Sequence, residues 1–312
     1  MKNRILHILI FLILSQGLIA SSSGDTLNIE VEGLTLEGTL LVPETDKAMP
    51  LVLFISGSGP TDRNGNQKTM QNNSLKMLAE GLRENGIASL RYDKRNCNPE
   101  YVKSIKEEDI SFEHFVDDAV AWVNHLNNDS RFEEIIVLGH SQGSLIGILS
   151  AQRSKVSKLI SLCGPGKEIG ESLMRQLKAQ GLKEIDKVQA VITSLENGET
   201  TDDYPRYLVS LFRPSVQPFL ISWMKYHPGE EVKKLNIPIA VIHGSSDSQI
   251  SEDESQALAD AVEGTEMVTL TGMNHVLKNV GDDFFANRNS YNDPNKPLHE
   301  DLLNVVVEFI KK

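Results

Sequence analysis

Hydrophobic residues occur along this chain in short unbroken runs that alternate with stretches of helical spacing. The runs at 51–55 and 135–138 are apolar throughout, as expected for strands of a parallel sheet that are covered on both faces. From Phe112 to Leu126 apolar residues recur with a period of about 3.6, which predicts an amphipathic helix that Ser111 caps. Repeated alternation of this kind predicts the α/β class, with a doubly wound and mostly parallel sheet.

Two stretches depart from this alternation. Between 27 and 42, apolar and polar residues alternate on either side of Gly33, which predicts an antiparallel hairpin with one face in water. Between 167 and 231, helical segments are broken at glycine and proline residues and no strand is evident, so we expect a helical cap over the carboxyl edge of the sheet. The expected segments are the first part of the core at 23–163, the cap at 164–231 and the second part of the core at 232–312.

The apolar run at 135–138 ends in Gly139-His140-Ser141-Gln142-Gly143 and passes directly into a stretch of helical spacing. Strand, tight turn and helix form the setting of a nucleophile elbow, in which the serine adopts a strained backbone conformation and flanking glycines avoid collisions. The pentapeptide alone also fits a glycine-rich turn with a solvated serine. Its context favours the elbow, and Ser141 is therefore the candidate nucleophile.

Two backbone amides are candidates for an oxyanion hole. Gln142 follows the serine at the start of a helix, where N–H groups lack intrahelical partners. In elbow geometry a second donor comes from the loop after an earlier strand, here Ser56-Gly57-Ser58-Gly59-Pro60 after the run at 51–55. We assign this donor to the N–H of Ser58, and the alternative is an ordinary glycine turn.

Three charged residues, Asp93-Lys94-Arg95, follow the predicted strand at 87–92. Charged side chains at the end of a strand are either solvated or paired with neighbouring loops. We expect these three to brace the active-site loops by ion pairs.

Composition narrows the classes of function. With 312 residues, 40% of them hydrophobic and 24% charged, the chain can bury a full core, and its net charge of −12 makes nucleic acid a poor partner. Its two cysteines, Cys97 and Cys163, follow strands that are not expected to be neighbours, so we expect free thiols. Cysteine and histidine show no metal-ligand spacing, and we expect neither a metal nor an organic cofactor.

The amino terminus has the three regions of a secretory signal peptide. Lys2 and Arg4 precede an apolar stretch from Ile5 to Leu14, and small residues follow from 15 to 23. We therefore expect a signal peptide at 1–22, export to the periplasm or the medium, and no stable membrane insertion after cleavage. The alternative is a retained anchor, although this stretch is short for a span of about 20 residues.

Three motifs resemble those of the α/β-hydrolase family. They are the pentapeptide at 139–143, His243-Gly244-Ser245-Ser246-Asp247 after a late strand, and Asn274-His275 after the last strand. Phe54 to Gly65 and Arg91 to Arg95 look like bacterial carboxylesterases grouped with serine aminopeptidase-like hydrolases. The chain departs from the usual family patterns in having Ser56 where histidine is common and Asn96 where glycine often follows the basic pair.

The resemblance implies a catalytic triad in the order serine, acid, histidine, which maps to Ser141, Asp247 and His275. A neutral imidazole takes the serine proton during attack, and a buried carboxylate fixes the tautomer of that imidazole. Glu252 and Asp253 are the nearest competitors for the acid, but we expect them in the first turn of the next helix. His140 and His243 also adjoin motifs, and strand and turn geometry predicts that both point into packing.

We therefore expect an exported serine hydrolase that cleaves carboxylic esters of small to medium acyl groups through an acyl-enzyme on Ser141. Its partner would be a small-molecule ester. One alternative is a peptidase of the proline-iminopeptidase kind, in which carboxylates of the cap hold the free amine of the substrate. The other is a non-catalytic binding protein on the same fold. The cap carboxylates that would serve the peptidase are Glu168, Glu171, Glu184 and Glu196.

Overall fold

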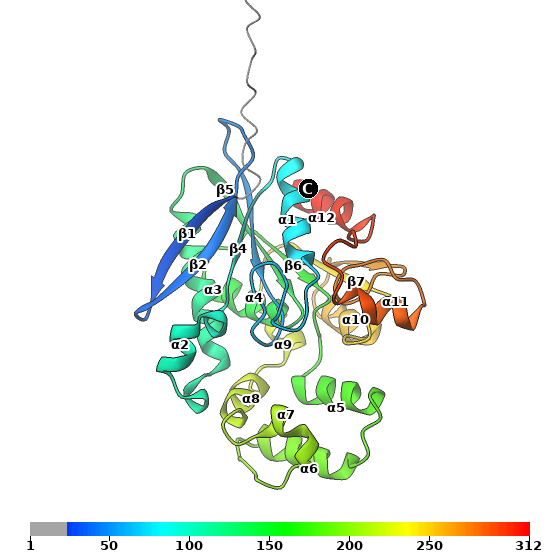
Figure 1. Cartoon of the computed structure of the whole chain (residues 1–312). Helices are drawn as coiled ribbons and strands as arrows, with labels where there is room; N and C mark the ends of the chain where they lie inside the picture. Colours follow the sequence, from blue (N-terminus) through cyan, green and yellow to red (C-terminus); the bar gives the residue numbers. More distant parts are fainter. Residues whose placement is uncertain (1–23) are drawn as a thin grey trace, which may run out of the picture.

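The computed structural model describes residues 24–312, so the expected signal peptide lies outside the described residues. Within 24–312 the strands form one eight-stranded sheet in the order β1-β2-β4-β3-β5-β6-β7-β8 (Figure 1). The fold class predicted from the sequence is confirmed. The strands are β1 (Asp25–Val31), β2 (Leu34–Leu41), β3 (Met49–Ile55), β4 (Ala88–Tyr92), β5 (Phe132–His140), β6 (Lys158–Leu162), β7 (Ile239–Gly244) and β8 (Glu266–Leu270).

The antiparallel part of the sheet is the predicted hairpin. β1 and β2 pair antiparallel, and β2 pairs antiparallel with β4, whereas all pairs from β4 to β8 are parallel. Glu32 and Gly33 join β1 to β2 with φ of 52° and 81°, as a two-residue turn matched to the twist of the strands requires. The alternation of apolar and polar residues on either side of Gly33 therefore predicted both the hairpin and the position of its turn.

The parallel strands are covered on both faces, as their unbroken apolar runs predict. Along β3, Leu51 and Leu53 join the core beneath α3 and α4, whereas Val52 and Phe54 join the core beneath α1 and α12. The two helical layers lie on opposite faces of the sheet. These helices are α1 (Ser74–Glu84), α3 (Phe112–Asn127), α4 (Gln142–Arg153) and α12 (Leu302–Lys311).

The stretch expected to form a cap is helical and lies between β6 and β7, as a layer beyond one end of the sheet (Figure 1). The cap boundaries at 164 and 231 remain a prediction. No helix within 24–312 is long and apolar enough to cross a bilayer. The helices of this stretch are α5 (Ile169–Ala179), α6 (Ile185–Glu196), η3 (Arg206–Leu208), α7 (Val209–Phe212), α8 (Gln217–Met224) and α9 (Pro228–Val232).

Several short elements were not predicted. α2 and its flanking 3-10 turns lie between β4 and α3, and α11 lies in the long segment after β8. α10 was predicted, as the helix whose first turn contains Glu252 and Asp253. These elements are η1 (Arg95–Cys97), α2 (Pro99–Ser104), η2 (Glu107–Asp109), α10 (Glu252–Asp260) and α11 (Phe284–Ser290).

Candidate active site

Ser141 stands at a sharp turn between β5 and α4, with φ of 55° and ψ of −123°. A non-glycine residue in this region of φ is strained, and such strain is tolerated only where the surrounding structure enforces it. A methyl group added at Gly139 would lie 2.2 Å from the carbonyl oxygen of Gly143, and one added at Gly143 would lie 2.1 Å from that of Ile55. Both glycines of the motif are therefore required by close backbone contacts.

Asp247 lies in the loop after β7, and its side chain is fully buried. One carboxylate oxygen accepts hydrogen bonds from the backbone N–H of Gln249 at 2.7 Å and of Ile250 at 2.9 Å. The other oxygen accepts a hydrogen bond from Nδ1 of His275 at 2.7 Å. Burial raises the pKa of the Asp247 carboxyl, but the nearby His275 and these donors outweigh it and hold the pKa below its usual value.

His275 lies in the loop after β8, which is the parallel neighbour of β7. Because parallel strands end at the same edge of a sheet, the two loops meet there and bring His275 to Asp247. The hydrogen bond to Asp247 assigns the proton to Nδ1 and leaves the lone pair on Nε2 free to accept a proton. A turn in which Leu277 donates to the carbonyl of Asn274 at 2.9 Å holds the loop.

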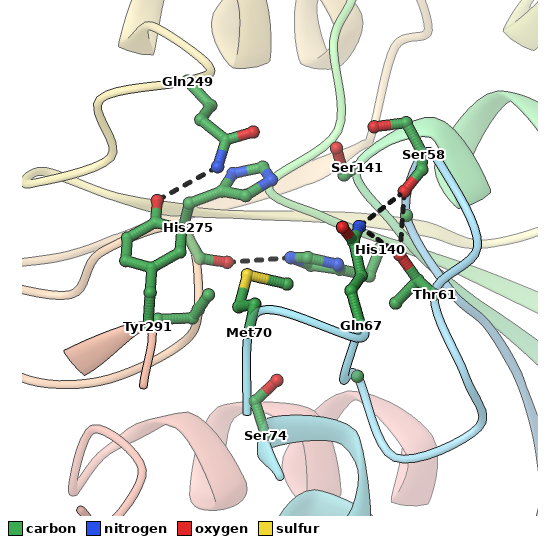
Figure 2. A pocket seen from close by; sticks show the side chains of 13 residues that line it. Ser58, Thr61, Gln67, Met70, Ser74, His140, Ser141, Gln249, His275 and Tyr291 are labelled. Atoms are coloured by element: carbon green, nitrogen blue, oxygen red, sulfur yellow. Dashed lines mark hydrogen bonds between the residues drawn. The ribbon is translucent and has the colours of Figure 1, made fainter. Parts of the chain in front are cut away.

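Ser141 and His275 both line a cavity of about 260 Å³ at this edge of the sheet (Figure 2). Within residues 24–312 no hydrogen bond joins the Ser141 hydroxyl to His275. Contacts of this kind in catalytic sites are often long without substrate and shorten in its complex. The structure therefore brings the three residues expected as a triad to one site, with the histidine–acid bond already formed.

The glycine-rich loop after β3 lies directly against the elbow. A methyl group at Gly57 would be 3.2 Å from Cβ of Ser141, so the loop approaches at a distance that favours glycine. Ser58, the next residue, lines the same cavity as Ser141 (Figure 2). Among the described residues, neither the N–H of Ser58 nor that of Gln142 donates a hydrogen bond to another group. Both amides expected to form an oxyanion hole are therefore free to donate.

The charged residues after β4 brace this region, two of them by the expected ion pairs and Lys94 by a hydrogen bond instead. Asp93 pairs with Arg63 of the glycine-rich loop at 2.5 Å, and it accepts a second bond from the Arg63 backbone at 2.8 Å. Lys94 donates to the carbonyl oxygen of Gly57. Arg95 forms a buried ion pair with Asp118 of α3 at 2.6 Å. The contacts of Asp93 and Lys94 therefore tie the strand end to the loop that carries Ser58.

His140 was expected to point into packing, and its side chain is buried, but it packs against the loop of His275 at the wall of the cavity. Its ring lines the cavity, 4.8 Å from the ring of His275 between centroids. Burial lowers the pKa of His140 to about 3, so the ring is neutral, and its Nε2 hydrogen is donated to the carbonyl oxygen of His275 at 2.8 Å. His140 thus helps to fix the histidine loop. His243 is buried in packing as expected, with Ser255 3.1 Å from its Nδ1.

Sequence reasoning also missed the polar wall of the cavity. Gln249 donates to the hydroxyl of Tyr291 at 3.0 Å, and both side chains face the cavity (Figure 2). On the opposite side, Gln67 donates to the hydroxyl of Thr61 at 2.8 Å. Gln249 is two residues from Asp247 and could have been found from that motif, whereas nothing in the sequence around Tyr291 signals its position.

The competing acids lie elsewhere. Glu252 and Asp253 are in the first turn of α10, and Glu252 accepts from Thr269 at 3.1 Å. None of the cap carboxylates expected for a peptidase lines the cavity of Ser141; three of them line a separate hollow between α5 and α6, and Glu184 precedes α6. Those three are Glu168, Glu171 and Glu196.

Cys97 and Cys163 are free thiols, as expected. The Cys163 sulfur and ring nitrogens of His140 and His275 lie within 4.8 Å of one another. This group does not offer an open set of metal ligands, because Nδ1 of His275 is bonded to Asp247 and Nε2 of His140 is bonded to a backbone carbonyl. These three side chains are therefore packed against one another at the carboxyl edge of the sheet.

Comparisons with known proteins agree with this fold. Residues 70–203 match the family model described as serine aminopeptidase, S33. The chain is 28% identical over 255 residues to esterase EstD of Thermotoga maritima, which covers 80% of this chain. The chain spans about three fifths, 59%, of that relative's length.

Solved structures show the same fold. Est1E from Butyrivibrio proteoclasticus matches with a TM-score of 0.58 and 18% identity, over 92% of this chain and 96% of its own. A proline iminopeptidase from Mycobacterium smegmatis matches with a TM-score of 0.59 and 16% identity, over 92% of this chain and 98% of its own. These structures show that the chain has the α/β-hydrolase fold, and the family model and the esterase relative show that it resembles the serine aminopeptidase-like hydrolases.

Proposed function

We propose that the protein is a serine hydrolase of carboxylic esters, with Ser141 as nucleophile, His275 as general base and Asp247 as the acid that orients it. The observation that supports this most directly is the 2.7 Å bond between Asp247 and Nδ1 of His275, beside a serine on a strained turn. Ser141 and His275 face one cavity, and two free backbone amides adjoin the serine.

The reaction follows from these positions. The Ser141 hydroxyl oxygen attacks the ester carbonyl while its proton passes to Nε2 of His275. The N–H groups of Ser58 and Gln142 stabilise the negative oxygen that forms. When the tetrahedral intermediate collapses, the bond to the alcohol oxygen breaks and the alcohol takes the proton from His275. Water then attacks the carbonyl of the acyl-enzyme while one of its protons passes to His275. The bond to the Ser141 oxygen breaks, the serine takes that proton back, and the carboxylic acid leaves.

An ester is favoured over an aminoacyl substrate by the charge of the cavity. Among the described residues no carboxylate lines it, so the free ammonium group of an aminopeptidase substrate would meet no opposite charge there. The acidic residues of the cap line a separate hollow that also contains the basic residues Arg175 and Lys178. The sequence relative is named as an esterase, whereas one structural neighbour is a proline iminopeptidase, so both substrate classes belong in the test.

We assign the acyl group to a second hollow, of about 130 Å³, which is lined by Gly59 and Gln142, the neighbours of Ser58 and Ser141. An apolar cavity of about 150 Å³ in another protein holds benzene, so a group of about six carbon atoms fits. Phe115 of α3 and Phe219 of α8 line it together with Glu107, whose carboxylate is already paired with Arg213 at 2.8 Å. The buried Nε2 of Gln142 has no hydrogen-bond partner among the described residues. A hydroxyl on the acyl group would satisfy that donor; one structure of the neighbour Est1E has ferulic acid bound.

We also propose that the protein is exported to the periplasm or the medium. The support is the amino-terminal sequence, which has a basic start, an apolar centre and a stretch of small residues up to residue 23. Amino-terminal sequencing of the protein recovered from its native cells would test the proposal. A start close to residue 23 would agree with export, and an intact amino terminus on a cytoplasmic protein would contradict it.

A fluorophosphonate tests the nucleophile directly, because only a serine activated by a base attacks phosphorus rapidly. The wild-type protein should be labelled on Ser141, and Ser141→Ala should not be labelled. Ser150→Ala is a matched control, since this buried serine of α4 bonds only within its own helix, to the carbonyl of Gly147 at 2.9 Å. It should be labelled like the wild type. A wild-type protein without labelling would favour the non-catalytic binding protein.

Turnover of nitrophenyl esters and aminoacyl nitroanilides distinguishes the two enzyme classes. Esters with acyl groups up to the size of a benzoyl group should be cleaved with the higher kcat/KM. Preference for the aminoacyl amides would replace the esterase by the peptidase.

A further inference from the structure

Lys94 is a buried cation aimed at the glycine-rich loop. It lies two residues after the end of β4 and is 1% exposed. Its Nζ donates to the carbonyl oxygen of Gly57 and lies 5.5 Å from the centre of the Phe115 ring. Among the described residues it forms no ion pair, although both of its charged neighbours, Asp93 and Arg95, are paired.

The acceptor of this bond belongs to the peptide group that carries a proposed oxyanion donor. The carbonyl of Gly57 and the N–H of Ser58 are the two ends of one planar unit, so a contact at one end fixes the orientation of the other. Hydrogen bonds in a chain also polarise one another, and a charged donor at the oxygen makes the N–H at the far end a stronger donor.

We propose that protonated Lys94 is a positioning residue that orients and polarises the Gly57–Ser58 peptide, so that the N–H of Ser58 stabilises the negative oxygen of the tetrahedral intermediate. The inference rests on the proposed function, because it needs an oxyanion at this place. It assigns to Lys94 an effect on the transition state and not on substrate binding, because the full negative charge develops only after attack.

A purely structural brace would not need this charge. Burying an ammonium group without a carboxylate is unfavourable, and a neutral donor would satisfy the same carbonyl. Arg63 and Arg95 show how this region braces itself elsewhere, since each of them is paired with a carboxylate. Lys94 instead directs its charge at a single carbonyl oxygen beside the nucleophile.

The charge should be lost within an accessible range of pH. Burial lowers the pKa of Lys94 to about 8. Two other titratable groups face it: the Cys97 thiol of η1, whose pKa burial raises to about 11, and His140 of β5, whose pKa burial lowers to about 3. From α3 the packing group is the uncharged ring of Phe115. Lys94 is therefore protonated at pH 7 and becomes neutral as the pH rises through about 8, so the rate should fall above that pH.

The test is the pH dependence of kcat for a nitrophenyl ester whose acylation is rate-limiting, from pH 6 to 10, in three proteins. The wild type should lose activity with a midpoint near the pKa of Lys94, about 8. Lys94→Met should show kcat at pH 7 reduced about ten- to hundredfold, with KM within about threefold, and no alkaline loss. Lys278→Met is the matched control, because burial lowers the pKa of Lys278 to about 8 as well. Its alkaline loss should persist.

Lys94→Gln separates charge from hydrogen bonding, and it also serves if Lys94→Met does not fold. Glutamine keeps a neutral donor, so a brace would be restored and kcat would return, whereas we expect kcat to stay low. Both variants should still be labelled on Ser141 by a fluorophosphonate, more slowly than the wild type but to completion. Absence of labelling in the wild type would instead overturn the proposed function.

Three results would overturn the role of Lys94. They are a wild-type profile that stays flat to pH 10, an alkaline loss that persists without Lys94, and a Lys94→Gln variant within twofold of the wild-type kcat. A fall in melting temperature with unchanged kcat would likewise leave Lys94 as a structural residue only.

Discussion

At the scale of single residues, the acid of the expected triad had competitors in the sequence, because Glu252 and Asp253 also follow β7 shortly after Asp247. The structure separates them by their contacts. Asp247 accepts one bond from His275 and two from the backbone, whereas Asp253 is exposed in the first turn of α10. Of the acids that follow β7, Asp247 is the one whose side chain contacts the imidazole and can orient it.

Asp247→Asn keeps the shape of the side chain but removes its charge and permits the wrong tautomer of His275. The same change in the triad of a serine protease lowers turnover by about 10⁴, and we expect a loss of about two to four orders of magnitude in kcat with a smaller change in KM. Asp253→Asn should stay within about threefold of the wild type, since surface substitutions are usually mild. Steady-state kinetics on one ester would measure both.

The double variant Ser141→Ala/Asp247→Asn adds a further check. Residues that act as one unit are not additive, so the double variant should be no slower than Ser141→Ala alone. If Asp253→Asn lost most of its kcat while Asp247→Asn kept it, Asp247 could not be the acid of the triad.

The sequence predicted the residues that belong to motifs and missed those that reach the cavity from elsewhere. Ser141 was found because its neighbours must be glycine, and His275 because it follows the last strand. The place of His140 was only partly predicted, because strand alternation does not show that its buried ring packs against His275 at the wall of the cavity. Tyr291 was not foreseeable, since it follows α11, whose place depends on long-range packing.

At the scale of elements, the elbow depends on backbone segments that lie so close together that no side chain fits between them. Gly143→Ala would place a methyl group 2.1 Å from the carbonyl oxygen of Ile55, so β3 and α4 would have to move apart. We expect the free energy of unfolding to fall by about 3 kcal/mol or more, as for severe overpacking. Fluorophosphonate labelling should be lost with it, because the turn carries Ser141.

Gly86→Ala is the matched control for that substitution. Gly86 has φ of 79° but nothing within 4 Å of an added methyl group, so only backbone strain opposes alanine. We expect a loss of about 1–2 kcal/mol and normal labelling. Urea unfolding followed by fluorescence measures both variants, and equal losses would contradict the steric explanation of the elbow.

The elements that the sequence predicted are those with a buried apolar pattern. The missed helices lack one: α2 has no buried residue, and Ser290 is the single buried residue of α11. Their starts are set by local capping, since the side chains of Asn98 and Asp283 each accept two backbone hydrogen bonds. Hydrophobic periodicity therefore carries no information about them.

At the scale of the whole molecule, the cap is tied to the loop that holds the acid. Arg175 and Gln176 of α5 both donate to the carbonyl oxygen of Gln249, the latter at 3.0 Å. Gln249 in turn donates its backbone N–H to Asp247 and faces the cavity with its side chain. Arg175 also pairs with the buried Glu254 of α10 at 2.7 Å. The position of the cap is thereby linked to that of the acid.

Removing both donors tests whether this link matters for turnover. In Arg175→Met/Gln176→Leu the Gln249 loop loses its contacts with α5, and small displacements of a catalytic group are costly, so we expect kcat to fall about three- to thirtyfold. KM should change less, because the cavity wall remains.

Lys187→Met is the control: this basic residue of the cap pairs at 2.6 Å with Asp203, which also lies in the cap. Its kcat should stay within about twofold of the wild type, as expected for an exposed ion pair. Steady-state kinetics and thermal unfolding would be measured on all three proteins. If the double variant melted at a lower temperature but kept its full kcat, the cap would contribute stability alone, and the orientation of Asp247 would have to be maintained entirely by the loop and His275.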